Sequence, residues 1–355
     1  VAIGDEAGKT TQGTLAVAIG KDAGKTTQGT NSVAMGNLAG NSSQLVSSVA
    51  IGDSAGQTTQ GSLAVAIGKS SGTTSQGANS VAMGNLAGNS GQLVSSVAIG
   101  DSAGQTNQGT LSVAIGADAG TTSQATKSVA VGNLAGNTGQ SAWTVAVGDE
   151  AGRTDQGILA ISVGKKAGTT IQGDNSVSIG YLAGNSSQLV SSVAIGKSAG
   201  ETTQGTLSVA MGFETGKTSQ GANSVAIGNL AGNDSQLVSS VAIGDSSGQT
   251  DQGTLAVAVG KDAGKTSQGA NSVAMGNLAG NSGQLVSSVA IGDSAGQITQ
   301  GTLSVAIGNL AGNTSQGTTS VALGSGSGQN IQGDRSVAIG LNIENTSQGI
   351  ASIAI

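Results

Sequence analysis

The chain has 355 residues, including 62 Gly, one each of Phe, Tyr and Trp, and no Pro, Cys or His. Compact globular cores of this size depend on bulky side chains, so the composition excludes an ordinary globular domain. The net charge of −6 offers no basic surface for phosphates, and the few rings offer no stacking platform, which argues against nucleic-acid binding. No apolar run is long enough to span a bilayer, so no membrane insertion is expected in this segment.

The first predicted element is a short strand at residues 1–3, Val-Ala-Ile, ended by Gly4. Val and Ile share one face of this strand, and because charge never occurs there in later copies, we expect them to fill the interior. Ala would then face outward. An outward column that never holds Lys or Glu favours packing against another copy of the chain, although Ala could instead pack under a loop of the same chain. The candidate interface residues are Ala2, Ala18, Ala34, Ala50 and Ser162.

Residues 4–11, GDEAGKTT, look like a phosphate-binding P-loop. That motif needs four residues between its first Gly and Gly-Lys, and only three separate Gly4 from Gly8. Later copies replace the Lys, so we interpret the segment as a turn between two strands. The predicted turn glycines are Gly4, Gly8, Gly20 and Gly340.

A second short strand is predicted at residues 9–12, with residue 10 and Gln12 pointing inward and residues 9 and 11 facing water. A buried Gln amide needs hydrogen-bond partners, and identical residues stacked at the strand spacing of about 4.8 Å can bond one another. The expected structural ladder includes Gln12, Gln28, Gln124, Gln236 and Gln348. A ligand-binding role for this column is the alternative.

These elements recur every 16 residues, giving 22 repeats over residues 1–352 with no insertion or deletion. Position within a repeat is called its place, with Val1 at place 1. The regular period predicts one continuous all-β domain over residues 1–355, a parallel β-solenoid with one two-stranded coil per repeat. The last repeat, 337–352, is atypical and could be a cap. A 48-residue period lies over the repeats; recent duplication explains it, and a three-turn functional unit is the alternative.

The repeated SVAIGxxAG, as in Ser48–Gly52 with Ala55, resembles the YadA-like head repeat (Hep_Hag) of trimeric autotransporter adhesins. The resemblance covers essentially the whole chain. It implies a left-handed β-roll in which three chains pack into a trimeric head that presents surfaces for adhesion. The 16-residue period departs from the family, and the T-x-Q-G segment is more similar to phage tail-fibre and giant-virus surface proteins.

Together these features predict a non-enzymatic structural fibre or adhesin segment, extracellular, on a cell or virion surface. With no His or Cys the usual nucleophile–base pairs cannot form, and no catalytic residue, cofactor or metal site is expected. The expected partners are other copies of the chain and a host surface protein or glycan, with Trp143, Tyr181 and Phe213 as exposed contacts. A filament formed by stacking of solenoids is the alternative function, and an ice-binding solenoid ranks below it.

Overall fold

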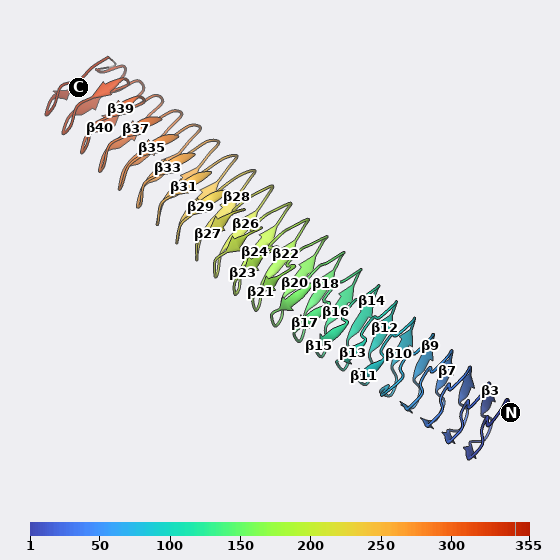
Figure 1. Ribbon diagram of the computed structural model, residues 1–355. Helices are drawn as coiled ribbons and strands as arrows, with labels where there is room; N and C mark the ends of the chain where they lie inside the picture. The colour runs from blue at the N-terminus through green and yellow to red at the C-terminus, as the bar shows by residue number, and fades with distance from the viewer. Residues whose placement is uncertain (345) are drawn as a thin grey trace. The chain divides into compact units, whose positions relative to one another are not determined.

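The computed structural model describes residues 1–344 and 346–355 and divides into two units, residues 1–176 and 177–355. Each unit is built of short strands and turns, and the described residues contain no helix. In each unit, strands of successive repeats pair in parallel, as Figure 1 shows. The chain is therefore an all-β parallel β-solenoid of about 22 turns, which confirms the fold class predicted from the repeat.

The first strand of each turn covers the Val-Ala-Ile segment and belongs to a long parallel sheet. In residues 1–176 its strands are β1 (Ala2–Ile3), β3 (Val17–Ile19), β5 (Val33–Met35), β7 (Val49–Ile51), β9 (Val65–Ile67), β10 (Val81–Met83), β12 (Val97–Ile99), β14 (Val113–Ile115), β16 (Val129–Val131), β18 (Val145–Val147) and β20 (Ile161–Val163). In residues 177–355 they are β22 (Val177–Ile179), β24 (Val193–Ile195), β26 (Val209–Met211), β28 (Val225–Ile227), β30 (Val241–Ile243), β32 (Val257–Val259), β34 (Val273–Met275), β36 (Val289–Ile291), β38 (Val305–Ile307), β40 (Val321–Leu323), β42 (Val337–Ile339) and β43 (Ile353–Ala354).

The second strand ends at the constant Gln of place 12 and is shorter than predicted; at Gln76 and Gln348 it is reduced to isolated bridges. In residues 1–176 these strands are β2 (Thr11–Gln12), β4 (Thr27–Gln28), β6 (Ser43–Gln44), β8 (Thr59–Gln60), β11 (Ser90–Gln92), β13 (Thr106–Gln108), β15 (Thr122–Gln124), β17 (Thr138–Gln140), β19 (Thr154–Gln156) and β21 (Ile171–Gln172). In residues 177–355 they are β23 (Ser187–Gln188), β25 (Thr203–Gln204), β27 (Ser219–Gln220), β29 (Asp234–Gln236), β31 (Thr250–Gln252), β33 (Thr266–Gln268), β35 (Ser282–Gln284), β37 (Ile298–Gln300), β39 (Ser315–Gln316) and β41 (Ile331–Gln332).

The pairing register is 16 residues in the ladders that the structure describes, so each side chain lies beside its counterpart in the next turn. β3 pairs with β5 to place Ala18 beside Ala34, and β4 pairs with β6 to place Gln28 beside Gln44. One inserted residue would move every later side chain to the wrong face of the sheet. The fixed repeat length is therefore a direct requirement of this fold.

The turns between strands depend on backbone conformations with positive φ. In the second repeat these are Gly20 (φ 122°), Asp22 (55°), Gly24 (54°) and Asn31 (58°). A Cβ on Gly20 would lie 2.6 Å from the carbonyl oxygen of Gly36 in the next turn, so only Gly fits. The four glycines predicted to form turns all have positive φ: Gly4, Gly8, Gly20 and Gly340.

The interior is filled by small side chains together with the Gln column. In the second repeat Ala18, Ala23 and Ser32 have no exposed surface, and Gln28 is 1% exposed. The prediction that the Ala column faces outward as a subunit interface is wrong, because a second copy cannot reach a residue that is already buried. Of the five candidates, the fully buried ones are Ala18, Ala34, Ala50 and Ser162, while Ala2 is exposed in the first turn.

The apolar side chains of places 1 and 3 were also predicted on the wrong face. Val33 is half-buried and Met35 is exposed, and both lie on the outer face of the sheet. The reason is the thinness of the coil. The Gln28 amide of the second strand reaches the carbonyl oxygen of Val17 in the first strand at 2.6 Å, which leaves room between the strands for a methyl group only.

The side chain at place 10 does not point inward, so this prediction is also wrong. Thr26, Thr58 and Thr122 are exposed, and no place-10 side chain is buried in any turn that the structure describes. In several turns the residue at place 11 has positive φ, for example Ser123 at 57°, so the simple alternation of a strand does not hold there. Gln at place 12 nevertheless points inward.

Candidate interaction surfaces

The buried Gln column forms hydrogen bonds both across the coil and along it. Nε2 of Gln60 donates to the carbonyl oxygen of Val49 at 2.6 Å and to Oε1 of Gln76 at 3.1 Å. The same side chain accepts from Nε2 of Gln44 at 3.1 Å. Each amide therefore joins the two strands of its own turn and can also join adjacent turns, which satisfies groups that would be costly to bury unpaired.

The five Gln residues named from the sequence all take part in these contacts. Gln12 donates to Gln28 at 3.2 Å, and Gln236 donates to Gln252 at 3.0 Å. Gln28, Gln124 and Gln348 donate to the place-1 carbonyl of their own turn. The ladder is interrupted at intervals, since Oε1 of some members, including Gln44 and Gln220, has no partner. This column is inside the fold and offers no surface to a ligand.

Ser162 occupies place 2, where nearly every other turn holds Ala. Its hydroxyl donates to Oε1 of Gln172 at 2.6 Å inside the coil. Ser162 and Ser178, the two exceptions to Ala at place 2, are thus small enough for the interior, and each supplies a donor to the ladder.

The outer face of the first sheet forms a continuous apolar surface, which we call the Val/Ile face. It consists of the side chains at places 1 and 3, and no charged residue occurs at either place in the 22 repeats. Ile99, Ile115 and Ile227 are each 37% exposed, and Met275 is 43% exposed. A flat apolar surface of this extent is unusual on a soluble monomer and is typical of a contact surface.

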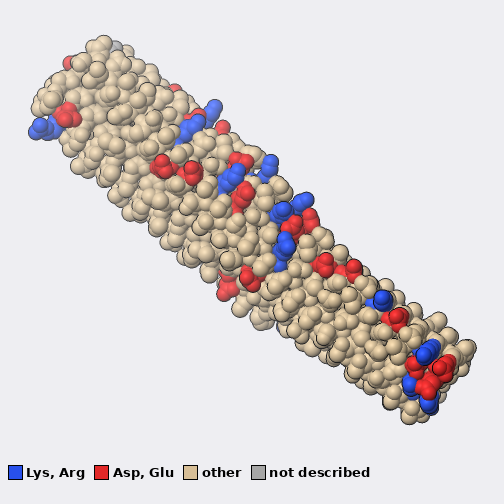
Figure 2. Space-filling view, viewed as in Figure 1, with Lys and Arg blue, Asp and Glu red and all other residues tan. Residues whose placement is uncertain are grey.

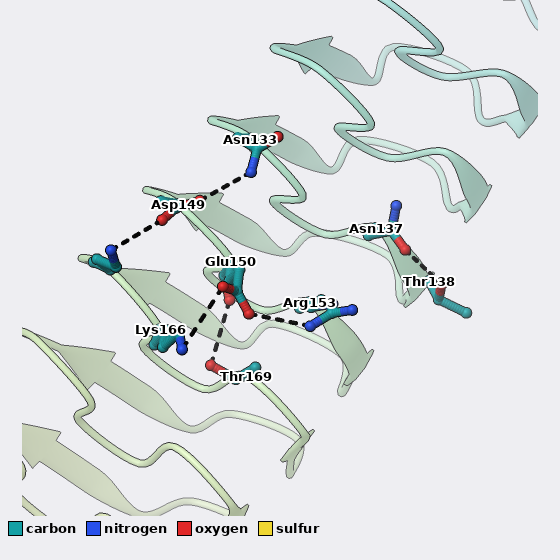
Figure 3. Close-up of polar contacts among 9 residues, drawn as sticks. Asn133, Asn137, Thr138, Asp149, Glu150, Arg153, Lys166 and Thr169 are labelled. Atoms are coloured by element: carbon teal, nitrogen blue, oxygen red, sulfur yellow. Dashed lines mark hydrogen bonds and ion pairs between the residues drawn. The ribbon is translucent and has the colours of Figure 1, made fainter.

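Most charged side chains lie instead at places 5, 6 and 9, along one edge of the coil. In Figure 2 they gather in a band within each unit, beside wide areas without charge. Figure 3 shows one group, in which Asn133 donates to Asp149 at 3.0 Å and Arg153 donates to Glu150 at 3.1 Å. The Asn133 amide is the main reason that the pKa of the Asp149 carboxyl lies below its ordinary value, and Lys165 lowers it further.

At the N-terminal turns, the like-charged Lys9 and Lys25 are both neutralised by acids. Lys25 contacts Glu6 and lies 2.9 Å from Asp22, and Lys9 also contacts Glu6. Hydrogen bonds from Lys25 and Lys9 lower the pKa of the Glu6 carboxyl to about 2, and hydrogen bonds to Glu6 and Asp22 raise the pKa of Lys25 above its ordinary value. These exposed pairs relieve repulsion within a solvated surface.

In the P-loop-like segment, residues 4–11, backbone amides of the second Gly and of residues that follow it are used to pair with the next turn. The amide of Gly8 donates to the carbonyl oxygen of Ala23 at 2.9 Å, and that of Thr10 donates to Lys25 at 2.9 Å. A phosphate cradle needs such amides free. Within residues 1–344 and 346–355, no group of three or more acidic, His or Cys side chains is placed to hold a metal ion.

The three aromatic residues are about half exposed. Trp143 is 52% exposed, with Nζ of Lys127 5.6 Å from its ring centre. Tyr181 and Phe213, each 44% exposed, occupy place 5 of turns two apart, and Lys197 of the intervening turn lies 5.2 Å from the Phe213 ring. The amide of Ser198 donates to the Tyr181 carbonyl at 2.8 Å, which fixes the adjacency of these turns.

These features define the class of the protein as a parallel β-solenoid repeat protein. No known family model matches the chain, and no curated protein matches it. Among the residues that the structure describes, no helix is long and apolar enough to cross a membrane.

Proposed function

We propose that the chain is a non-enzymatic structural fibre or adhesin segment that works as a homotrimer on the outside of a cell or virion. The observation that carries this proposal is the Val/Ile face. It is uncharged in every repeat and partly exposed along both units. Removing apolar surface from water stabilises an assembly by about 25 cal/mol for each Å² buried, so a long regular face of this kind favours association.

The resemblance to YadA-like head repeats supports a trimer of left-handed β-rolls. In such an assembly the Val/Ile faces of three copies would meet, while Ala and Ser remain in the interior of each coil. The charged edge at places 5, 6 and 9 would stay in water, where ion pairs such as Lys165 with Asp149, at 3.4 Å, carry little desolvation cost.

The oligomeric state of the full chain tests the proposal by multi-angle light scattering. A homotrimer should have three times the chain mass of 33.6 kDa. Replacing Ile99 and Ile115 with Lys places charge on the Val/Ile face and should shift the protein toward single chains. The matched control is Thr122→Lys in β15, on another surface, which should leave the mass unchanged. A monodisperse monomer of the unaltered chain would refute the trimer.

For adhesion, we propose that Tyr181, Lys197 and Phe213 form a contact for a host glycan. Two rings with a Lys between them replace the Asp, Lys and Asn that place 5 holds in most turns. Exposed rings stack on the apolar faces of sugars, and a neighbouring ammonium can bond hydroxyl groups. The double variant Tyr181→Asn, Phe213→Asn should lose binding on a glycan array, whereas Trp143→Ser should retain it; equal binding by all three proteins would exclude this contact.

Two other functions have specific observations in their favour. Filament formation is supported by the same uncharged face, and electron microscopy would show assemblies much longer than one chain. Ice binding gains support from the exposure of Thr26, Thr58 and Thr122 at place 10, although charged residues lie beside this column at place 9. Thermal hysteresis equal to that of buffer would remove it.

A further inference from the structure

Every three turns, the surface carries a cluster of exposed apolar side chains, which we call a knob. A knob consists of Leu at place 13 and Val at place 14 of one turn, with Leu at place 15 of the next. In one knob, Leu93, Val94 and Leu111 are 50%, 46% and 53% exposed, and the Leu111 amide donates to the Val94 carbonyl at 3.1 Å. The group recurs at 48-residue intervals between Leu45 and Leu285, with one exception at Ser141.

One knob has a different sequence but the same apolar character. The segment where Leu-Val should recur reads Ser141-Ala142, and Trp143 follows it directly. Together with Ile158 and Leu159 of the next turn, Trp143 forms a cluster in which all three side chains are about half exposed. Duplication of a 48-residue unit would copy the same residues, so it does not explain why different residues form an apolar cluster at this place.

The knobs also carry a conformational cost. Leu at place 15 has positive φ, for example 58° at Leu63 and 58° at Leu111. Neighbouring turns hold Asn or Ser there, such as Asn79 and Ser95, and Asn adopts this conformation more readily. Leu in this conformation costs on the order of 1 kcal/mol and is exposed besides. Leu at place 6 has the same conformation but is half-buried, so it is the cost combined with exposure that indicates a functional surface at the knobs.

Shallow hollows lie between the knobs in both units. In residues 1–176 one hollow is lined by Gly109, Ala125 and Thr126, with Leu93 of the adjacent knob as its wall. In residues 177–355 another is lined by Gly269 beside Leu285 and Val286, with one charged residue, Asp251, in its lining. The hollows arise because the turns between knobs have Gly or Ala at place 13 where the knob has Leu.

We infer that the knobs of one copy seat in the hollows of a second copy shifted along the axis by one or two turns, and thereby set the axial register of lateral contacts in a filament. This inference rests on the filament form of the proposed self-association, because copies around a threefold axis share one axial level. The Val/Ile face repeats in every turn, about 4.8 Å, so a slip by one turn would leave its contacts nearly unchanged. The knobs repeat every three turns, about 14 Å, so a slip that brings the two copies to the same level sets knob against knob.

Charge and area both favour a second copy as the occupant. Places 13–15 hold only four charged residues in the whole chain: Lys127, Asp174, Asp334 and Arg335. A partner must therefore be largely uncharged there, and it must match a three-turn spacing, which this chain itself has. If each of the nine knob side chains in residues 1–176 loses roughly 80 Å², about 700 Å² is buried, close to the ~800 Å² per partner of a standard interface.

The test uses full-length protein with a spin label at Thr122→Cys, which is exposed in a chain that has no Cys. Pulsed electron spin resonance then measures distances between labels on different copies. In the knob-free variant, the Leu, Val and Leu of each knob at places 13, 14 and 15 are replaced with Gly, Thr and Asn. In the knob of Trp143, Ile158 and Leu159 are replaced with Thr and Asn, and Trp143 with Ser. All these residue types occur at the same places in other turns. The unaltered assembly should give one narrow distance. The knob-free assembly should give several, separated by steps of about 4.8 Å.

A matched control replaces with Ser the Leu residues at place 6, which also have positive φ and a three-turn spacing, for example Leu38, Leu86 and Leu134. The control should keep the narrow distance. A knob-free chain that no longer assembles, beside a control that does, also supports the knobs as the contact. A narrow distance in the knob-free assembly overturns the inference and leaves the proposed self-association standing. A monomeric unaltered chain overturns both.

Discussion

Gln252 and Gln220 occupy the same place in turns two apart, yet they have different numbers of hydrogen bonds. Nε2 of Gln252 donates to the carbonyl oxygens of Val241 at 2.7 Å and Ala256 at 3.4 Å, and to Gln268 at 3.2 Å. Its Oε1 accepts from Gln236 at 3.0 Å. Gln220 donates to the Val209 carbonyl at 2.7 Å, and its Oε1 has no partner.

Replacing either residue with Ala should destabilise its turn, but by different amounts. Both changes open the same cavity and leave a buried place-1 carbonyl unpaired, at about 1–3 kcal/mol. Gln252→Ala also removes two ladder bonds, each worth about 1 kcal/mol. We therefore expect Gln252→Ala to cost about 2 kcal/mol more than Gln220→Ala, which corresponds to roughly a 30-fold difference in local opening.

Amide hydrogen exchange by mass spectrometry measures this opening on the full chain. A local measurement is needed because long repeat arrays do not unfold in a single two-state step. Peptides covering residues 241–256 and 209–224 report the two sites, and Thr266→Ala at the surface serves as a control that should leave exchange unchanged. Equal acceleration in the two Gln variants, or a larger effect of Gln220→Ala, would refute the reasoning about the ladder.

Three further predictions follow from the turns, the interior and the charged edge. Gly116→Ala should destabilise the fold in urea unfolding, because the new Cβ would lie 2.5 Å from a carbonyl oxygen of the next turn. Gly349→Ala should be neutral in the same assay, because no atom lies within 4 Å of its Cβ. Ala114→Leu should destabilise the interior by about 1–3 kcal/mol through overpacking, whereas the outward Ile115→Leu should not change the unfolding midpoint. The pKa of Glu6 is lowered from 4.5 to about 2, so its ionised form stabilises the fold above pH 4.5, and this stabilisation is lost as the pH falls toward 2. Titration of the carboxyl by NMR measures this pKa, and a value near 4.5 would contradict the pairing of Glu6 with two Lys.

Much of the fold could be predicted from the sequence because a solenoid stacks equivalent residues. The constant Gln at place 12 and Gly at place 4 indicated the buried amide and the tight turn without any knowledge of three-dimensional contacts. Strand alternation gave the correct pairing of places 1 and 3 on one face of the sheet. It could not determine which face was inside.

The error at Ala18 and Met35 came from judging burial by hydrophobicity. In a coil this thin, side-chain size decides, because the Gln28 amide and the opposite backbone occupy the space that a Val would need. The sequence does contain a signal, since place 2 never holds anything larger than Ser, whereas place 3 varies among Ile, Met, Val and Leu. Tolerance of different sizes indicates the outer surface in such a fold.

The exposed place 10 could not be predicted for a different reason. It is exposed for two different local reasons: the second strand begins only after Thr26 in β4, whereas in β15 the strand includes Thr122 but Ser123 has positive φ. The same residue types occur in both conformations. The knobs could be noticed in the sequence only as part of the 48-residue period, because their exposure and their spacing between hollows are properties of the folded surface.

The 16-residue register also bears on how the length of such a protein can change. Since β3 bonds to β1 and β5 alone, a whole turn can be gained or lost without disturbing distant turns. A gene that gains 16 codons keeps the fold but moves all later knobs out of phase with those before them. A gain of 48 codons lengthens the stack by about 14 Å and preserves the phase. If the knobs set the register as we infer, the three-turn unit is the smallest increment by which the protein can be lengthened while old and new copies still fit together.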